Sequence, residues 1–183
     1  MSNQPMNATT ADRAGHVTLR DGRVVAVRPL EPGDRDWLRA AVRRLSPETR
    51  YLRFASPKPH LTERELDFLV DVDHHRHEAI LATDPSTGRG IAVVRYVEAP
   101  GQPGVVEIAA TVADEWQGRG LGPALVAQLA QRALEEGHSA IRALVLATNQ
   151  RSIAMLLRAG FAPLKSQGTL REYELLLRGA EPH

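Results

Sequence analysis

Three glycines stand close together in one turn of the chain, Gln117-Gly118-Arg119-Gly120-Leu121-Gly122. Glycine adopts positive backbone φ angles at little cost, and without a side chain it lets a ligand approach the backbone closely. A long helical pattern follows the turn. The first N–H groups of a helix and the positive end of its dipole both favour an anion. We therefore expect this turn to bind a phosphate group.

Two common phosphate-binding motifs do not fit this turn. The dinucleotide pattern Gly-x-Gly-x-x-Gly fails because its last position is Pro123 when counted from Gly118 and Leu125 when counted from Gly120. The P-loop pattern fails because the turn has no Gly-Lys-Ser/Thr sequence. The pattern that fits is Gln-x-x-Gly-x-Gly, placed between a predicted strand and a predicted helix.

The strand predicted before this turn, residues 105–112, carries one carboxylate, Glu107. Alternation along a strand divides its residues between an apolar face, which we expect in the core, and a face where small residues flank Glu107. A primary amine is mostly protonated at neutral pH, so it must lose a proton before it can attack a thioester. Glu107 is placed to take that proton, through water, as a general base. A solvated or ion-paired glutamate is the alternative interpretation.

Periodicity and turn residues predict the elements that position these groups. Before the strand of Glu107 we expect a hairpin, three short helices and two strands, over residues 17–28, 34–45, 46–54, 62–70, 79–83 and 91–97. After it we expect a helix, a strand, a helix and a hairpin, over residues 120–136, 140–146, 149–159 and 161–177. An antiparallel meander that feeds a strand–helix–strand crossover implies a mixed α/β sheet.

Composition places limits on the function. The 183 residues suit one domain, and a net charge of +1 gives no case for broad nucleic-acid binding. The chain has no cysteine, which excludes disulfides, zinc thiolates and a cysteine nucleophile. We find neither a secretory signal nor a membrane span, and expect a cytoplasmic protein. We expect a disordered tail over residues 1–15, one domain over residues 16–178 and a short tail over residues 179–183.

The glycine turn, the strand before it, Asn149 and the sequence Ala159-Gly160-Phe161 together resemble the GNAT superfamily of N-acetyltransferases. The acetyl-CoA motif of that family is Arg/Gln-x-x-Gly-x-Gly/Ala in this context, and the resemblance spans roughly residues 24–177. It implies a single α/β (α+β) domain of the GNAT fold, with a mixed, mostly antiparallel central sheet flanked by helices. It also implies acetyl-CoA as co-substrate, no metal, and direct transfer to a primary amine in a ternary complex.

The resemblance implies which residues would bind each part of the cofactor. Backbone amides of the turn would hold the pyrophosphate, and the main chain near Val112 would bond the pantetheine arm where two strands splay apart. Arg119 would add a phosphate contact and Asn149 would lie beside the arm; a solvated turn arginine and a helix N-cap are the alternatives. The implied cofactor residues are Val112, Gln117, Gly118, Arg119, Gly120, Leu121, Gly122, Pro123, Ala124 and Asn149.

The same resemblance supports Glu107 as the base and exposes one departure. Many family members carry a tyrosine, four residues before the glycine of Gly-Phe, that protonates the leaving thiolate. Leu156 occupies that position here. Ser152 and Tyr173 are the nearby hydroxyl groups, and both are better explained as structural residues.

A second resemblance concerns the acceptor. The sequence Leu-Ser-Pro-Glu-Thr-Arg-Tyr-Leu-Arg-Phe over residues 45–54 is similar to GNAT domains that acetylate protein lysines, as is Val-Asp-His-His over residues 72–75. It implies that Arg50, Tyr51, Arg53 and Phe54 shape the acceptor site, with core packing and solvated arginines as the alternative.

We therefore expect a protein lysine as the acceptor. A small-molecule amine acetyltransferase and a non-catalytic acyl-CoA-binding module stay open, as does a homodimer. The nearby His74, His75 and His77 lack a metal-binding motif and are interpreted as a polar loop.

Overall fold

The computed structural model describes residues 14–56 and 58–177, and all statements about the structure refer to them. Residues 1–13 of the predicted N-terminal tail and the whole predicted C-terminal tail, residues 179–183, lie outside the described residues. Gly15, which we placed in the first tail, already begins a strand.

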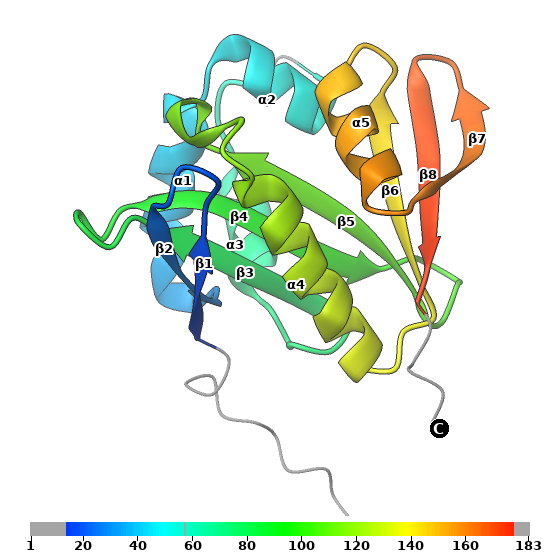
Figure 1. Ribbon diagram of the computed structural model, residues 1–183, viewed down its shortest axis with the longest axis horizontal. Coiled ribbons are helices and arrows are strands. Elements are labelled where there is room, and N and C mark those ends of the chain that lie inside the picture. The colour runs from blue at the N-terminus through cyan, green and yellow to red at the C-terminus, as the bar shows by residue number, and fades with distance from the viewer. Residues whose placement is uncertain (1–13, 57, 178–183) are drawn as a thin grey trace, which may run out of the picture.

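One sheet of eight strands runs through the molecule in the order β1-β2-β3-β4-β5-β6-β8-β7 (Figure 1). Every neighbouring pair is antiparallel except β5 and β6, which are parallel. The predicted mixed, mostly antiparallel sheet is therefore confirmed. The strands are β1 Gly15–Thr18, β2 Val24–Pro29, β3 His77–Thr83, β4 Gly90–Glu98, β5 Val105–Val112, β6 Ala140–Leu146, β7 Ala162–Gln167 and β8 Leu170–Leu176.

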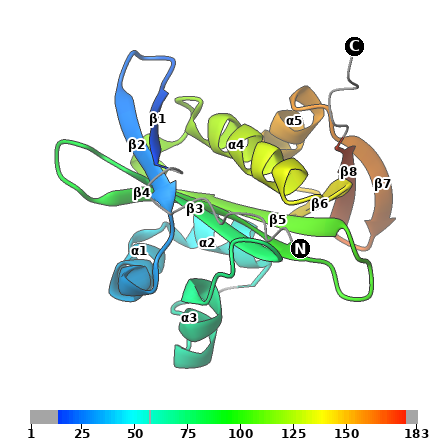
Figure 2. The ribbon, with the colours of Figure 1, turned by 90° about the horizontal axis from the view of Figure 1, so that it is seen from below.

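Helices cover both faces of this sheet. In Figure 2 α4 and α5 lie on one side, and α1, α2 and α3 lie on the other. The helices are α1 Arg35–Arg44, α2 Pro47–Phe54, α3 Glu63–Val70, α4 Leu121–Glu135 and α5 Gln150–Arg158, with short 3-10 turns η2 Pro32–Asp34 and η3 Asp114–Trp116. Within the described ranges, none of the helices is both long and apolar enough to cross a membrane.

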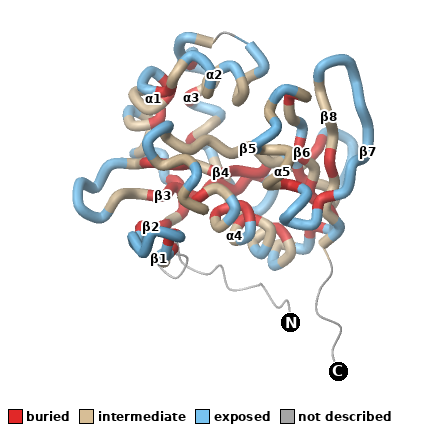
Figure 3. The backbone as a smooth tube through the Cα atoms, turned by 45° about the horizontal axis from the view of Figure 1, so that its top comes forward, coloured by how far each residue is buried: buried red, intermediate tan, exposed pale blue. Residues whose placement is uncertain are grey.

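Each face of the sheet has its own apolar core. Leu125 and Leu129 of α4 are buried together with Val94 and Val106 of the central strands. On the opposite face, residues of α1, α3 and β3 form a second cluster that includes Leu66. Figure 3 shows the buried segments running along the central strands and along α4. The sheet is therefore buried on both faces near its middle, and this apolar packing holds the helices against it.

Local signals set the helix boundaries, as predicted. The side chain of Ser46 accepts a hydrogen bond from the backbone N–H of Thr49, 3.1 Å away, at the start of α2. Thr62 and Glu65 form a capping box at the start of α3. The third strand starts two residues earlier than expected, because His77 pairs with Val97 of β4. That difference arises from long-range pairing, which a local pattern does not contain.

The contact between α1 and β4 requires a glycine at the start of β4. The Trp37 indole Nε1 donates a hydrogen bond of 3.3 Å to the carbonyl of Gly90, and a Cβ added to Gly90 would overlap the indole ring. We expect Gly90→Ala to lower the free energy of unfolding by about 1–3 kcal/mol, measured by urea denaturation, because the ring must move out of a packed position. Gly33→Ala, where the added Cβ meets open space, is the matched control. Equal stability of the two variants would contradict this account of the α1–β4 contact.

Candidate functional site

The glycine turn has the backbone that an anion site requires. Gly118 and Gly120 have φ angles of 77° and 90°, values that strain other residues. Gly120 is the N-cap of α4 and offers no side chain to cap the helix. The N–H groups of Leu121 and Gly122 have no hydrogen-bond acceptor among the described residues. Two backbone donors at the positive end of α4 are thus available to an anion, which agrees with the sequence-based prediction.

The side chain of Gln117 joins three elements around the turn. Its Nε2 donates to the carbonyl of Val112, 3.1 Å away, and to Thr49 Oγ1 of α2, 3.2 Å away. Its Oε1 accepts a hydrogen bond of 2.9 Å from Arg151 Nη1 of α5. A single amide therefore fixes the end of β5 relative to α2 and α5.

Asp114 extends this network to the first turn of α2. Its carboxylate accepts hydrogen bonds from the N–H and Oγ of Ser46, both at 2.9 Å, and from Thr49 Oγ1 at 2.6 Å. Burial alone would raise the pKa of Asp114, but these hydrogen bonds outweigh it and hold the pKa below its usual value. The carboxylate is therefore charged at neutral pH and anchors the positive end of α2.

Arg119 is bonded within the protein, so it is not the solvated turn arginine of the alternative interpretation. Its Nη1 lies 2.7 Å from Asp21 Oδ2 in the β1–β2 turn, and its Nε donates to the carbonyl of Glu115 at 3.0 Å. The guanidinium also stacks over Trp116, 5.7 Å from the ring centroid. A phosphate contact by Arg119 stays a prediction, and it would have to share these bonds.

Arg151 is a residue that sequence reasoning missed. Its Nη2 lies 3.2 Å from the place that a Cβ on Gly118 would occupy, so its guanidinium leans over the turn. Arg151 is exposed, and it belongs to α5 rather than to the motif. The only sequence signal was its place in the first turn of the helix that follows β6, two residues after Asn149.

The predicted splay lies next to the turn. β5 and β6 pair over only four residues each, with Ile108 opposite Ala143 as the last pair, although β5 continues to Val112 and β6 to Leu146. A Cβ on Gly122 would contact Val112 Cγ2 at 3.8 Å and Met155 Sδ at 3.6 Å. The start of α4 and the helix α5 therefore meet at the mouth of the gap between the two strands.

Asn149 stands at the start of α5. Its Oδ1 accepts a hydrogen bond of 3.1 Å from the N–H of Ser152, so the N-cap alternative describes this side chain. The amide NH₂ of Asn149 has no acceptor among residues 14–56 and 58–177. That donor is compatible with the predicted contact to a ligand, which stays a prediction.

Glu107 is exposed on the face of β5 opposite α4. Its strand neighbours are Val97 on β4 and Arg142 on β6. Arg142 is held by Glu174, with Nε 2.9 Å from Oε2, and by the side chain of Gln102. Glu107 has no hydrogen bond or ion pair with any other described residue. The carboxylate is thus solvated, it is not ion-paired, and it lies one residue before the strands separate.

The hydroxyl groups considered as proton donors have different surroundings. Leu156 is 2% exposed and packs in the core cluster, so the family's tyrosine position is apolar here. Tyr173 is 7% exposed in that same cluster, and no described residue hydrogen-bonds its hydroxyl. The N–H of Ser152 is used to cap α5.

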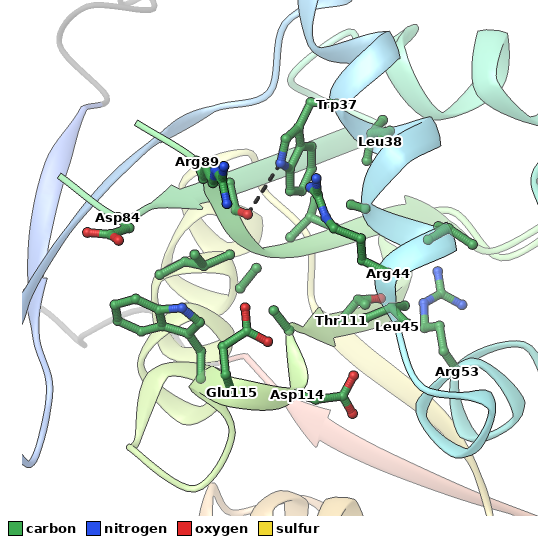
Figure 4. A pocket seen from close by; sticks show the side chains of 18 of the residues that line it. Trp37, Leu38, Arg44, Leu45, Arg53, Asp84, Arg89, Thr111, Asp114 and Glu115 are labelled. Carbon is green, nitrogen blue, oxygen red and sulfur yellow. Dashed lines mark hydrogen bonds between the residues drawn. The ribbon is translucent and has the colours of Figure 1, made fainter. Parts of the chain in front are cut away.

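A cavity of about 230 Å³ lies between α1, α2 and the ends of β4 and β5. Arg53 and Phe54, two of the predicted acceptor residues, line it, as do Leu45 and Thr111 (Figure 4). The other two predicted residues do not line it: Arg50 donates to the carbonyl of Pro59 at 3.5 Å, and Tyr51 is 45% exposed.

Arg95 of β4 also lines this cavity and was missed by sequence reasoning. It is 5% exposed, and its Nη1 contacts the carbonyl of Leu69 and His77 Nε2, both at 2.9 Å. Burial, and then the neighbouring Arg95, lower the pKa of His77 to about 4, so this imidazole is neutral at pH 7.

The other two histidines of the predicted polar loop contact carboxylates. His74 Nδ1 lies 2.8 Å from Glu78, and His75 Nδ1 lies 3.0 Å from Glu136. In the part of the chain that is described, no group of three or more side chains is arranged to hold a metal ion.

The sequence is similar to that of known acetyltransferases. The family model of the acetyltransferase (GNAT) family matches residues 39–161. An acetyltransferase of Pseudomonas aeruginosa is 34% identical over 146 residues, which cover 79% of this chain and 78% of that protein. The acetyltransferase Pat of Mycolicibacterium smegmatis is 34% identical over 145 residues, covering 79% of this chain but 43% of Pat.

Solved structures show the same likeness. The GNAT domain of S. lividans PAT superposes with a TM-score of 0.84 at 30% identity, and the match covers 90% of this chain and 97% of that one. A cAMP-binding acyltransferase from Mycobacterium smegmatis is 27% identical with a TM-score of 0.64, over 91% of this chain and 48% of that protein.

If the turn holds a pyrophosphate, Gly120→Ala should weaken CoA binding and also lower stability. Gly120 has a φ of 90°, and an added Cβ would lie 3.2 Å from Arg20 Cγ. Gly137, which follows α4 at its other end, has a φ of 86° with no atom near an added Cβ. Both alanine variants should lose about 1–2 kcal/mol of unfolding free energy, because both need a left-handed alanine. Calorimetric titration with CoA should show weaker binding for Gly120→Ala alone. Equal CoA affinity in the two variants would contradict pyrophosphate binding by the turn.

The neutral His77 predicts a dependence of stability on pH. Its pKa falls from 6.5 to about 4 on folding, so the unfolded chain binds more protons between these values. The free energy of unfolding is therefore not reduced by His77 above pH 6.5. It decreases as the pH falls toward 4, by at most about 3 kcal/mol, because the unfolded chain then binds a proton that the folded chain does not. Urea denaturation at both ends of this range should show a flatter pH dependence for His77→Gln than for the wild type. His60→Gln, an exposed control, should keep the wild-type slope; a wild-type slope in His77→Gln would contradict the assignment.

Proposed function

Since the chain belongs to the acetyltransferase (GNAT) family, we propose that it transfers an acetyl group from acetyl-CoA directly to a primary amine, preferably a protein lysine. The observation that carries the proposal is the position of Glu107. This carboxylate has no hydrogen bond or ion pair with any described residue, and it lies where β5 and β6 separate, one strand length from the glycine turn. We further propose that residues 16–178 form the acetyltransferase domain and that it acts in the cytoplasm.

The cofactor side of the proposal rests on the turn and the gap. The N–H groups of Leu121 and Gly122, which have no acceptor among the described residues, would bond the pyrophosphate, and the guanidinium of Arg151, which lies close to Gly118, would add a charge-assisted contact. From Val112 back to Glu107 the strand rises by about 16 Å. The arm of CoA would run along this stretch and pair with backbone groups that β6 leaves free, which places the thioester near Glu107.

The acceptor side rests on the opposite face of β5. The amine loses a proton to the Glu107 carboxylate, directly or through a water molecule. The amine nitrogen then attacks the thioester carbonyl carbon, a C–N bond forms, and the C–S bond breaks as the tetrahedral intermediate collapses. The second proton of the former ammonium passes to solvent water during this collapse, and the thiolate of CoA is the leaving group. The apolar Leu156 offers no acid there, so protonation of the thiolate by solvent after release is the simplest course.

An open surface beside Glu107 supports a protein acceptor. Arg142 and Leu144 of β6 share the face of Glu107, and Glu172 and Glu174 of β8 continue it. The helices α1, α2 and α3 lie over the other half of this face (Figure 2). Leu144 is 60% exposed. A lysine on the surface of a folded protein could therefore approach Glu107 across β6. The similarity to the acetyltransferase Pat points the same way.

Two other functions have distinct supporting observations. A small-molecule amine acetyltransferase is favoured by the cavity that Arg53 and Thr111 line. A non-catalytic acyl-CoA-binding module is favoured by the apolar Leu156. Thiol release from acetyl-CoA, measured with an amine panel and with proteins of the native lysate, separates them. Lysine acetylation found by mass spectrometry supports the proposal, turnover of free amines alone supports the first alternative, and tight CoA binding without turnover supports the second.

Glu107→Gln should retain CoA affinity and lose turnover by about 10²-fold, because the neutral amide cannot accept the proton. Glu135→Gln, on the exposed surface of α4 away from the gap, is the control and should keep full turnover. The measurement is initial-rate thiol release together with calorimetric titration of CoA. Wild-type turnover in Glu107→Gln at neutral pH would remove the residue from the role of base.

A further inference from the structure

Two arginines line the cavity beside β5, and neither forms an ion pair with a carboxylate in the described part of the chain. Arg95 is almost completely buried, and its Nε and Nη2 have no hydrogen-bond acceptor among the described residues. Arg53 of α2 is half-buried, its guanidinium lies 4.9 Å from the centroid of the Phe54 ring, and it forms no hydrogen bond or ion pair with any described residue. In Figure 4 Arg53 extends from α2 toward the part of the cavity that Leu45 and Thr111 line.

Removing two positive charges from water is costly unless an anion joins them. Burial lowers the pKa of Arg53 to about 10, and burial together with Arg53 lowers the pKa of Arg95 to about 9. Both groups still carry their charge at neutral pH. No described carboxylate affects either pKa. Leu61 and Leu69 are among the apolar residues that line the cavity, so an anion bound there would be weakly screened.

The acidic residues of this cavity are directed elsewhere. Asp84 accepts hydrogen bonds from Ser86 and Thr87 in its own turn. Asp114 is engaged by the first turn of α2, as described above. Glu115 lies beside Trp116, well separated from Arg53 in Figure 4.

The arginine pair lies close to the proposed reaction centre. Arg95 is paired with Ala109 of β5, which shares the face of Glu107 and follows it by two residues. The two positions are thus one strand apart, about 5 Å, and about 7 Å apart along the strand. A group bound by Arg95 and Arg53 could belong to the same molecule as an amine that stands at Glu107.

We propose that Arg53 and Arg95 form a carboxylate-binding site, and that this carboxylate is carried by the amine acceptor. The inference rests on the proposed acetyl transfer and specifies its acceptor. The site would select a lysine with an acidic neighbour, or a small amine that carries a carboxylate, over its uncharged counterpart. Arg53 and Arg95 are specificity-determining residues, and proton transfer is left to Glu107. A carboxylate on the acyl group, as in succinyl-CoA, is the other source of the same chemistry.

The first test uses matched acceptors. Pairs of lysine peptides that differ by glutamate or glutamine beside the lysine, and the pair lysine and lysinamide, are compared by kcat/KM for thiol release. We expect the wild type to favour the carboxylate member by about tenfold or more, as a charge-assisted hydrogen bond would give. Arg53→Gln should abolish the preference, and Arg53→Lys should restore part of it. Arg43→Gln, which removes a charge from the exposed side of α1, should keep it.

The outcomes separate this inference from the function on which it rests. Turnover without a carboxylate preference, or a preference that Arg53→Gln retains, overturns the acceptor site and leaves acetyl transfer standing. A wild-type preference for succinyl-CoA over acetyl-CoA that Arg53→Gln removes would overturn the assignment to the acceptor. If no amine is acetylated, the proposed function fails, and thermal unfolding in sodium sulfate decides the site. Stabilisation by sulfate that is reduced in Arg53→Gln and kept in Arg43→Gln supports it, and equal stabilisation in all three proteins overturns it.

Discussion

The hydrogen bonds of the Gln117 side chain are the interaction on which the site depends. One amide bonds the last carbonyl of β5, the hydroxyl of Thr49 on α2 and the guanidinium of Arg151 on α5. These three elements are the strand of the proposed base, a wall of the proposed acceptor cavity and a wall of the proposed cofactor gap. An amide can do this because it donates and accepts at once, so the elements on both sides of the turn are held by one rigid group. The glutamine that begins the sequence motif therefore also connects elements outside the turn.

The sheet separates the two substrates of the proposed reaction. Its α4 face carries the turn and one apolar core, and its other face carries Glu107, the second apolar core and the arginine-lined cavity. In the described part of the chain β5 and β6 stop pairing after Ile108 and Ala143, and we propose that the two substrates meet at this gap.

The order of elements, their boundaries and the family were predictable from the sequence. Glycine, proline and N-cap residues act locally, and alternation and helical spacing record which face of each element is buried. The turn was recognisable for the same reason, since its conformation depends on Gly118 and Gly120 themselves. The position of Glu107 on the face opposite Val106 also followed from alternation alone. Strand β3 began earlier than predicted because His77 gains its partner only from β4.

Other properties of the site could not be predicted, because they depend on residues that are distant in the chain. The sequence determined that Glu107 faces away from the core, but only the fold shows that Arg142 is held by Glu174 and leaves Glu107 unpaired. Likewise, the sequence identified Arg53, whereas its relation to Arg95 arises from the packing of α2 and β4 around one cavity. A sequence records backbone preference and burial pattern, which are local. Charge pairing is decided by which side chains tertiary packing brings within a few ångströms, so it was settled by the tertiary structure alone.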